Sequence, residues 1–294
     1  MINYLLLVFA AILLAVNFCI NKLYQKQAGT SLKAGFFFSA LSGFCSAIIF
    51  FALNGFRASF SVYSIVMVIC QSVLSMSYTL LGFRILKDSS MALYTLFLMT
   101  GGMTIPYLWG LLFLDEPFSW LRTAGLVVLI CAVALSNVSK QRPGMKQLLM
   151  CVGVFVLNGF VSVVSKLHQI QTGYPTISTT EFVMYNGVVS FLIAGTAFLI
   201  CKRKERKQTQ EETSCVKKHV ILPLIVVSAV IGGVSYMIQL FGATNLPATV
   251  LYPFLTGGSM ICSTLAGIVI FREKPPKSVV ISVCLCFVGT LMFL

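Results

Sequence analysis

Two stretches of the chain repeat the same arrangement of residues suited to hold a small molecule. A Ser-Tyr pair is followed, sixteen residues after its tyrosine, by a Leu-Tyr pair: Ser77-Tyr78 with Leu93-Tyr94, and Ser235-Tyr236 with Leu251-Tyr252. A tyrosine in apolar surroundings offers an aromatic face and one hydrogen-bonding group, which suits reversible binding. We therefore expect these two serines and four tyrosines to line a cavity. For Tyr94 the alternative is a place in the interfacial aromatic belt.

Four amide side chains also lie inside apolar stretches: Asn17, Gln71, Asn158 and Gln239. In hydrocarbon an amide must find its hydrogen-bond partner in a neighbouring helix, in water or in a ligand. We interpret these residues as further cavity positions. The alternative is that they hold helices together.

One carboxylate, Glu181, lies near the start of an apolar stretch, with Tyr185 and Asn186 on a similar helical face. A carboxylate that is buried in a membrane resists ionisation and can carry a proton. Proton coupling through Glu181 is therefore one hypothesis. A place at the interface, facing water, is the other.

Composition identifies the elements that must position these groups. Of 294 residues, 58% are hydrophobic and only 10% are charged, and the mean hydropathy is +0.94. A helix needs about 20 apolar residues to cross a bilayer. The sequence predicts an all-α membrane protein with ten spans, at about 3–21, 34–54, 62–85, 90–114, 119–138, 146–166, 178–201, 219–241, 247–271 and 277–294. Barrel strands are disfavoured because no alternation of apolar and polar residues is present.

The basic residues predict how the spans are oriented. We number each connection by the span that precedes it. Eighteen of the 21 Lys and Arg residues lie in the odd-numbered connections, including the basic loop 202–218, and only Arg57, Arg122 and Lys166 lie on the other side. By the positive-inside rule, the odd connections are cytoplasmic and both termini are outside. The net charge of +13 therefore reflects membrane topology and not binding to nucleic acid.

The two tyrosine stretches belong to a longer internal repeat. Gly110 is followed six residues later by Glu116, and Gly267 is followed at the same distance by Glu273. All these correspondences have an offset of about 157 residues, which is roughly half the chain. The pattern predicts two five-helix repeats, at 1–139 and 145–294. Because five is odd, the two repeats have opposite orientations in the membrane, as in many transporters.

The two repeat ends carry a family resemblance. The segments LLFLDEPFSWLRTAG (111–125) and IVIFREKPPKSVVIS (268–282) resemble the signature of the drug/metabolite transporter superfamily, specifically its EamA-like members. This resemblance implies a ten-helix inverted-repeat fold and a central cavity lined by spans 1, 3, 4, 6, 8 and 9. It also implies transport of small organic solutes such as metabolites, amino acids or drugs, often as export. Such relatives are commonly drawn with cytoplasmic termini, whereas the charges here predict termini outside.

Several charged residues at the ends of spans favour structural roles. Glu116 and Glu273 each precede a proline-containing turn, where we expect them to hold the next helix. Lys22 and Lys166 end the first and sixth spans. Both are expected to extend their ammonium groups to the interface.

The function predicted from the sequence is a secondary transporter in the cell membrane that works by alternating access. Its partners are a small-molecule solute and the lipid bilayer. No nucleotide-binding motif and no catalytic constellation such as HExxH is found, which disfavours an ATPase or an intramembrane enzyme. No metal and no cofactor is expected. A solute-sensing receptor and a channel-like facilitator are the alternatives.

Overall fold

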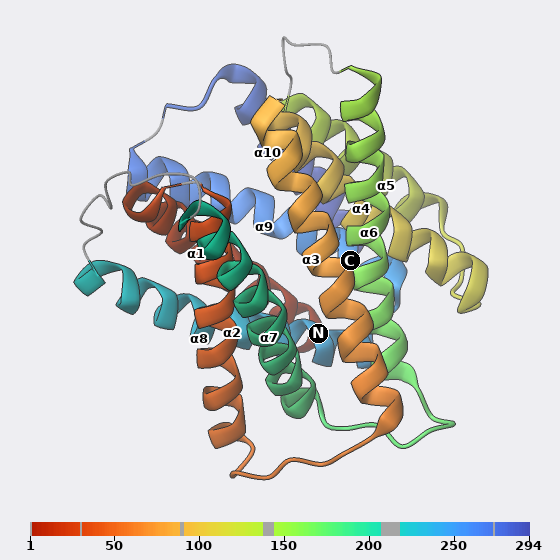
Figure 1. Ribbon diagram of the computed structural model, residues 1–294. Coiled ribbons are helices and arrows are strands. Elements are labelled where there is room, and N and C mark those ends of the chain that lie inside the picture. The colour runs from red at the N-terminus through yellow and green to blue at the C-terminus, as the bar shows by residue number, and fades with distance from the viewer. Residues whose placement is uncertain (1, 30, 89–90, 138–143, 207–217, 273) are drawn as a thin grey trace.

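The computed structural model describes residues 2–29, 31–88, 91–137, 144–206, 218–272 and 274–294. Within these ranges the chain forms ten α-helices and no strand (Figure 1), which confirms the all-α prediction. The helices are α1 (Ile2–Ala28), α2 (Leu32–Leu53), α3 (Val62–Asp88), α4 (Met91–Phe113), α5 (Trp120–Ser136), α6 (Met145–Ile170), α7 (Thr179–Arg206), α8 (Lys218–Asn245), α9 (Ala248–Phe271) and α10 (Lys277–Leu291).

Eight of these helices are long and apolar enough to cross a membrane. The other two, α5 with 17 residues and α10 with 15 residues, are apolar but shorter than the roughly 20 residues that a bilayer core requires. They pack against each other. The prediction of ten spans is therefore confirmed for eight helices.

The surface of the helices is unusually apolar. Exposed side chains include Phe9, Ile48, Leu112, Leu192 and Val269, which come from five different helices. A soluble protein seldom leaves contiguous apolar surface of this kind in water. Backbone groups in hydrocarbon also need internal hydrogen bonds, which helices supply. The chain is a multi-pass membrane protein.

The helices pack in a regular set of pairs. Helix α1 packs on α8 and α9, α6 packs on α3 and α4, and α2 packs on α7. Helix α4 also packs on α9, and α5 packs on α10. Each of these pairs joins a helix before residue 139 to a helix after residue 144, so the two halves of the chain are interleaved throughout the bundle.

The α2–α7 pair depends on two glycines that face each other. A Cβ atom at Gly43 would lie 2.8 Å from the carbonyl oxygen of Gly187, and a Cβ at Gly187 would lie 2.8 Å from the carbonyl oxygen of Gly43. Neither backbone can move away without separating the helices. Small residues at both positions therefore set the distance between α2 and α7.

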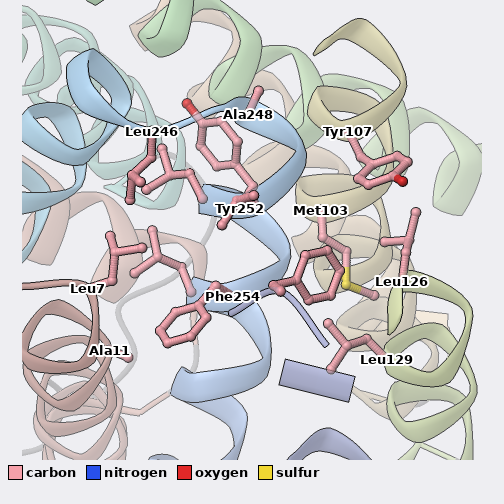
Figure 2. Packing of buried hydrophobic residues seen from close by; sticks show 14 of the residues in the cluster. Leu7, Ala11, Met103, Tyr107, Leu126, Leu129, Leu246, Ala248, Tyr252 and Phe254 are labelled. Atoms are coloured by element: carbon pink, nitrogen blue, oxygen red, sulfur yellow. The ribbon is translucent and has the colours of Figure 1, made fainter. Parts of the chain in front are cut away.

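The largest buried cluster lies where the two halves meet at α1, α4, α5 and α9. Leu7 of α1, Met103 of α4, Leu129 of α5 and Phe254 of α9 are all part of it (Figure 2). Tyr252 of α9 lies in the same cluster, and its hydroxyl points away from the apolar side chains (Figure 2). The cluster fills the space between these helices with apolar atoms, so the polar site must lie elsewhere.

Candidate functional site

A polar cavity of about 310 Å³ lies between α1, α2, α7 and α8. Lining residues near the middle of their helices include Asn17 in α1, Ser42 in α2, Ser190 in α7 and Ser228 in α8. In a bundle whose helices cross a bilayer, this places the cavity near the middle of the membrane. Binding sites of membrane transporters are typically found at that depth.

Helix α2 supplies a row of three serines to the cavity: Ser39, Ser42 and Ser46. Their spacing of three and four residues places them on one face of the helix. Ser190 of α7 lies four residues after Asn186 and joins them. Among the described residues, these four serines have no hydrogen bond from their hydroxyl groups to the protein. By contrast, Ser77 and Thr79 bond back to the carbonyls of their own helix, at 2.7 Å each.

The two asparagines of the cavity are held in place by their side-chain oxygens. Ser228 donates to Oδ1 of Asn17 at 2.6 Å, and Ser72 of α3 donates to Oδ1 of Asn186 at 2.9 Å. Each oxygen therefore has a partner in a neighbouring helix. The arrangement leaves the amide nitrogens to interact with a bound molecule.

Tyr236 of α8 joins the cavity to its surroundings. Its ring lines the cavity, and its hydroxyl is within hydrogen-bonding distance of Gln71 of α3 and Ser165 of α6. Ser165 also donates to the side-chain oxygen of Gln71 at 3.0 Å. We call Gln71, Ser165 and Tyr236 the polar triad. It ties three helices together at one wall of the cavity.

Asn17 and Tyr236 are the predicted cavity residues that line this cavity. Gln71 is one contact away, through Tyr236. Ser235 instead donates to the carbonyl of Ala10 in α1 at 2.9 Å and accepts from Gln239 at 3.2 Å. Ser235 therefore links α8 to α1, and Gln239 bonds to it within α8.

The remaining predicted residues contact other helices. Asn158 of α6 donates to the carbonyl of Leu98 in α4 at 2.7 Å. Tyr252 of α9 donates to the carbonyl of Ser162 in α6 at 2.6 Å. Both side chains therefore join neighbouring helices, which was the alternative stated for the amides.

Tyr78 and Tyr94 lie in a separate apolar cluster with Ile85, Cys151 and Val154, between α3, α4 and α6. Tyr94 also lies against Gly82. Ser77 bonds within its own helix. The repeated tyrosines therefore have different surroundings in the two halves, because Tyr236 faces the cavity while Tyr78 is packed among apolar side chains.

The helices that line this cavity differ from those that the family resemblance implies. Of spans 1, 3, 4, 6, 8 and 9, only α1 and α8 line it, and α2 and α7 complete it. The physical reason is close packing elsewhere. The bond from Tyr252 to Ser162 and the polar triad occupy the space between α3, α6, α8 and α9.

Glu181 caps the N-terminal end of α7. Its carboxylate accepts from the backbone N–H of Ser59 at 2.7 Å and from the amide of Asn54 at 3.2 Å. It also accepts from both the N–H and the hydroxyl of Ser178 at 2.9 Å, while Ser178 accepts from the N–H of Glu181 at 3.3 Å. This reciprocal pair is a capping box. Proton coupling through Glu181 stays a prediction, but these contacts favour a structural role.

Glu116 and Lys166 both bind backbone groups at the turn between α8 and α9. Glu116 accepts from the backbone N–H groups of Ala248 and Thr249, at 2.6 and 2.8 Å, where α9 begins. Lys166 is only 6% exposed, and its ammonium donates to the carbonyls of Ala243 and Leu246 at 2.7 Å each. The expectation that Lys166 reaches the interface is therefore wrong. The C-terminal end of α8 lies within reach of the ammonium and offers carbonyls that no donor within the helix satisfies.

Glu273 lies outside the described residues, as do residues 207–217 of the basic loop.

Sequence reasoning missed most of the polar lining: Ser39, Ser42, Ser46, Ser190 and Ser228. A signal for three of them was available, since serines spaced by three and four residues form one helical face. The signal is weak because serine is small enough to pack anywhere between helices. Only the tertiary structure shows that the serine face of α2 meets α7 and α8 across a space.

A second hollow of about 520 Å³ lies beside the turn between α9 and α10, lined by Ser263, Thr264 and Lys274 among others. It is at the end of the bundle and not at mid-length. No cluster of three metal-ligating side chains is found in the part of the chain that the structure describes.

Comparison with known proteins adds two findings. The model of a family described as the EamA-like transporter family matches residues 145–294. A solved structure, described only as a crystal structure of a protein, is 15% identical to this chain, with a TM-score of 0.74 over 98% of this chain and 94% of that one. At that identity the likeness concerns the fold alone. A comparison with curated proteins gives no match.

Proposed function

This chain belongs to the EamA-like transporter family, within the drug/metabolite transporter superfamily, and we propose that it is a secondary transporter that carries small organic solutes across a cell membrane. The observation that carries this proposal is the polar cavity at mid-length of an otherwise apolar bundle. A membrane protein has no packing reason to keep unpaired hydroxyls at that depth, since each costs free energy in apolar surroundings. A solute that bonds to them supplies the reason.

The transport mechanism we propose is alternating access between two inverted five-helix repeats. When each helix of the first half is matched to the helix five positions later in the chain, most packing pairs correspond to one another. The pair α1–α8 matches α6–α3, and α1–α9 matches α6–α4. The pairs α2–α7, α4–α9 and α5–α10 match themselves. This pattern, together with the offset of about 157 residues in the sequence, supports a two-fold relation between the halves.

Three pairs lack a comparable counterpart among the described residues, namely α6–α8, α7–α8 and α5–α9. The first of them supports a mechanism with two states. Helix α6 packs on α8, whereas the corresponding helices α1 and α3 make no comparable contact among the described residues. The α6–α8 contact includes Ser165 with Tyr236 and Lys166 with the end of α8. In the opposite state of a two-fold transporter, α1 closes on α3 while α6 leaves α8.

The even-numbered connections lie at the end of the bundle that this contact closes, and we call it the even-loop end. The α2–α3 and α6–α7 connections meet there through Ser61, which bonds the carbonyl of Pro175, and through Glu181 (Figure 1). With the odd connections in the cytoplasm, we propose that the even-loop end faces outward. The described state is then closed toward the outside.

Counterflow in proteoliposomes tests the proposed function. Vesicles containing the purified protein are loaded with one unlabelled solute, diluted, and given the same solute in labelled form. The panel comprises amino acids, sugars, nucleosides and cationic drugs. A transporter accumulates the label transiently above its external concentration, which a channel cannot do. Binding without flux would indicate a receptor, and equilibration without accumulation would indicate a channel; either result would overturn the proposal.

A further inference from the structure

We infer that the cavity between α1, α2, α7 and α8 binds an uncharged, polyhydroxylated solute of monosaccharide size, an inference that rests on the proposed transport function. The cavity is a defined space with a polar lining of its own. The inference follows from the chemistry of that lining, from its lack of charge and from its volume.

The lining offers many groups that both donate and accept hydrogen bonds. The hydroxyls of Ser39, Ser42, Ser46 and Ser190 make no hydrogen bond to protein within the described ranges, and all four residues are half-buried. Serines in membrane helices commonly bond back to the carbonyl four residues earlier. Here they do not, so their hydrogen-bonding capacity is directed to the cavity.

Hydroxyl groups of a solute match this set. A serine hydroxyl has one donor and two acceptor sites, so it pairs with an alcohol in either direction. The amide nitrogens of Asn17 and Asn186 add donors, since the oxygens of these side chains already have partners. An apolar solute would leave all these groups unpaired, which is costly.

Charge is the second argument. Among the residues that the structure describes, those that line the cavity include no Asp, Glu, Lys, Arg or His. An ion at mid-membrane needs a counter-charge or several fixed dipoles to offset the loss of hydration. A neutral solute needs neither. This disfavours amino acids, organic cations and carboxylates as ligands of this cavity.

Size and shape complete the argument. A volume of about 310 Å³ is at the lower limit of ligand pockets, which span about 300–1,000 Å³. The rings of Phe38 and Tyr236 line the same space. They offer apolar faces for the C–H groups of a sugar or polyol, while the serines bond its hydroxyls.

The test measures binding and transport separately on the same purified protein. Binding of tritiated D-ribose, ribitol and D-glucose is measured in detergent, with L-glutamate, L-lysine and choline as charged comparisons. The variant S42A/S190A removes one hydroxyl from each of two facing helices. The control is S136A, since Ser136 bonds to Val133 at the end of α5 and lies outside the cavity.

We expect at least one of the three neutral probes to bind, and none of the charged ones. Affinity for that probe is expected to fall about 10- to 30-fold in S42A/S190A, because two hydrogen bonds to the solute are lost, and to be unchanged in S136A. An unchanged thermal melting curve shows that the double variant is folded.

Failure of this inference can be told apart from failure of the transport proposal. Counterflow of an amino acid or a cation without binding of any neutral probe would overturn the inference and leave the transport function intact. Binding of a neutral probe without counterflow would support the cavity chemistry and overturn the transport function. Binding that is equal in wild type and S42A/S190A would show that the solute binds elsewhere and would overturn the inference.

Discussion

Lys166 and Glu116 bind the two sides of the turn that connects α8 to α9. The ammonium of Lys166 bonds two carbonyls where α8 ends, and the carboxylate of Glu116 bonds two N–H groups where α9 begins. A cation at a helix C-terminus and an anion at a helix N-terminus both complement the helix dipole. One residue comes from each half of the chain, so the turn between α8 and α9 is fixed by both halves.

Substituting Lys166 with Met should destabilise the protein strongly. The change removes two charge-assisted hydrogen bonds and leaves the carbonyls of Ala243 and Leu246 buried without these partners. We expect the free energy of unfolding to fall by about 3 kcal/mol, measured by reversible unfolding in mixed micelles containing sodium dodecyl sulfate. Lys146→Met is the control, because Lys146 is exposed on the same helix. Equal effects of the two variants would contradict the role assigned to Lys166.

Gly110→Ala should act through Glu116. A Cβ atom at Gly110 would lie 2.6 Å from Oε2 of Glu116, so the carboxylate must move away from the start of α9. We expect G110A and E116Q each to lower the free energy of unfolding by about 1–3 kcal/mol. The double variant should lose little more than either single one, since both remove the same interaction. Additive losses in the double-mutant cycle would show that the two residues act independently.

Glu181→Gln separates capping from proton coupling. The carboxylate of Glu181 accepts from Asn54, Ser59 and Ser178, and a neutral amide bonds these donors less well. We expect a loss of about 1–3 kcal/mol in stability with the pH dependence of counterflow unchanged. If E181Q instead abolished the pH dependence, Glu181 would carry the coupling proton.

Gly187→Ala should weaken the α2–α7 pair. The added Cβ would lie 2.8 Å from the carbonyl oxygen of Gly43 and 2.9 Å from the N atom of Ala47, so the helices must separate. Overpacking of this kind costs about 1–3 kcal/mol. Gly195→Ala on the same helix is the control, since nothing lies within 4 Å of its added Cβ. Size-exclusion profiles and thermal melting of the two variants give the comparison, and similar profiles would show that α2 and α7 tolerate a wider spacing.

Tyr236→Phe should affect transport rate more than binding. The ring that lines the cavity is kept, while the hydroxyl that contacts Gln71 and Ser165 is lost. The polar triad holds the α6–α8 contact of the closed end, so its loss should shift the balance between states. We expect the counterflow rate to change about fivefold and the affinity less than twofold. Tyr107→Phe, which loses only a bond to Thr123, serves as the control; an equal change in both variants would remove the triad from the mechanism.

The sequence by itself determined the membrane class, the helical elements and the family. These follow from local properties, because a span requires about 20 apolar residues wherever it lies in the chain. The bounds of α2, α3 and α9 lie within a few residues of the predicted spans for this reason. The signature around Glu116 likewise depends on neighbouring residues alone.

The cavity was decided by tertiary structure. Ser42 and Ser190 are 148 positions apart in the sequence, and nothing local predicts that their helices meet across a space. The repeat predicts that Tyr78 and Tyr236 occupy equivalent positions, but their surroundings differ, since α6 packs on α8 in this state while α1 does not pack comparably on α3 among the described residues. Lys166 shows the same limit, because an ammonium at the end of a span reaches the interface unless a helix terminus lies beside it. Which polar group meets which partner depends on how helices pack, and packing is a property of the whole chain.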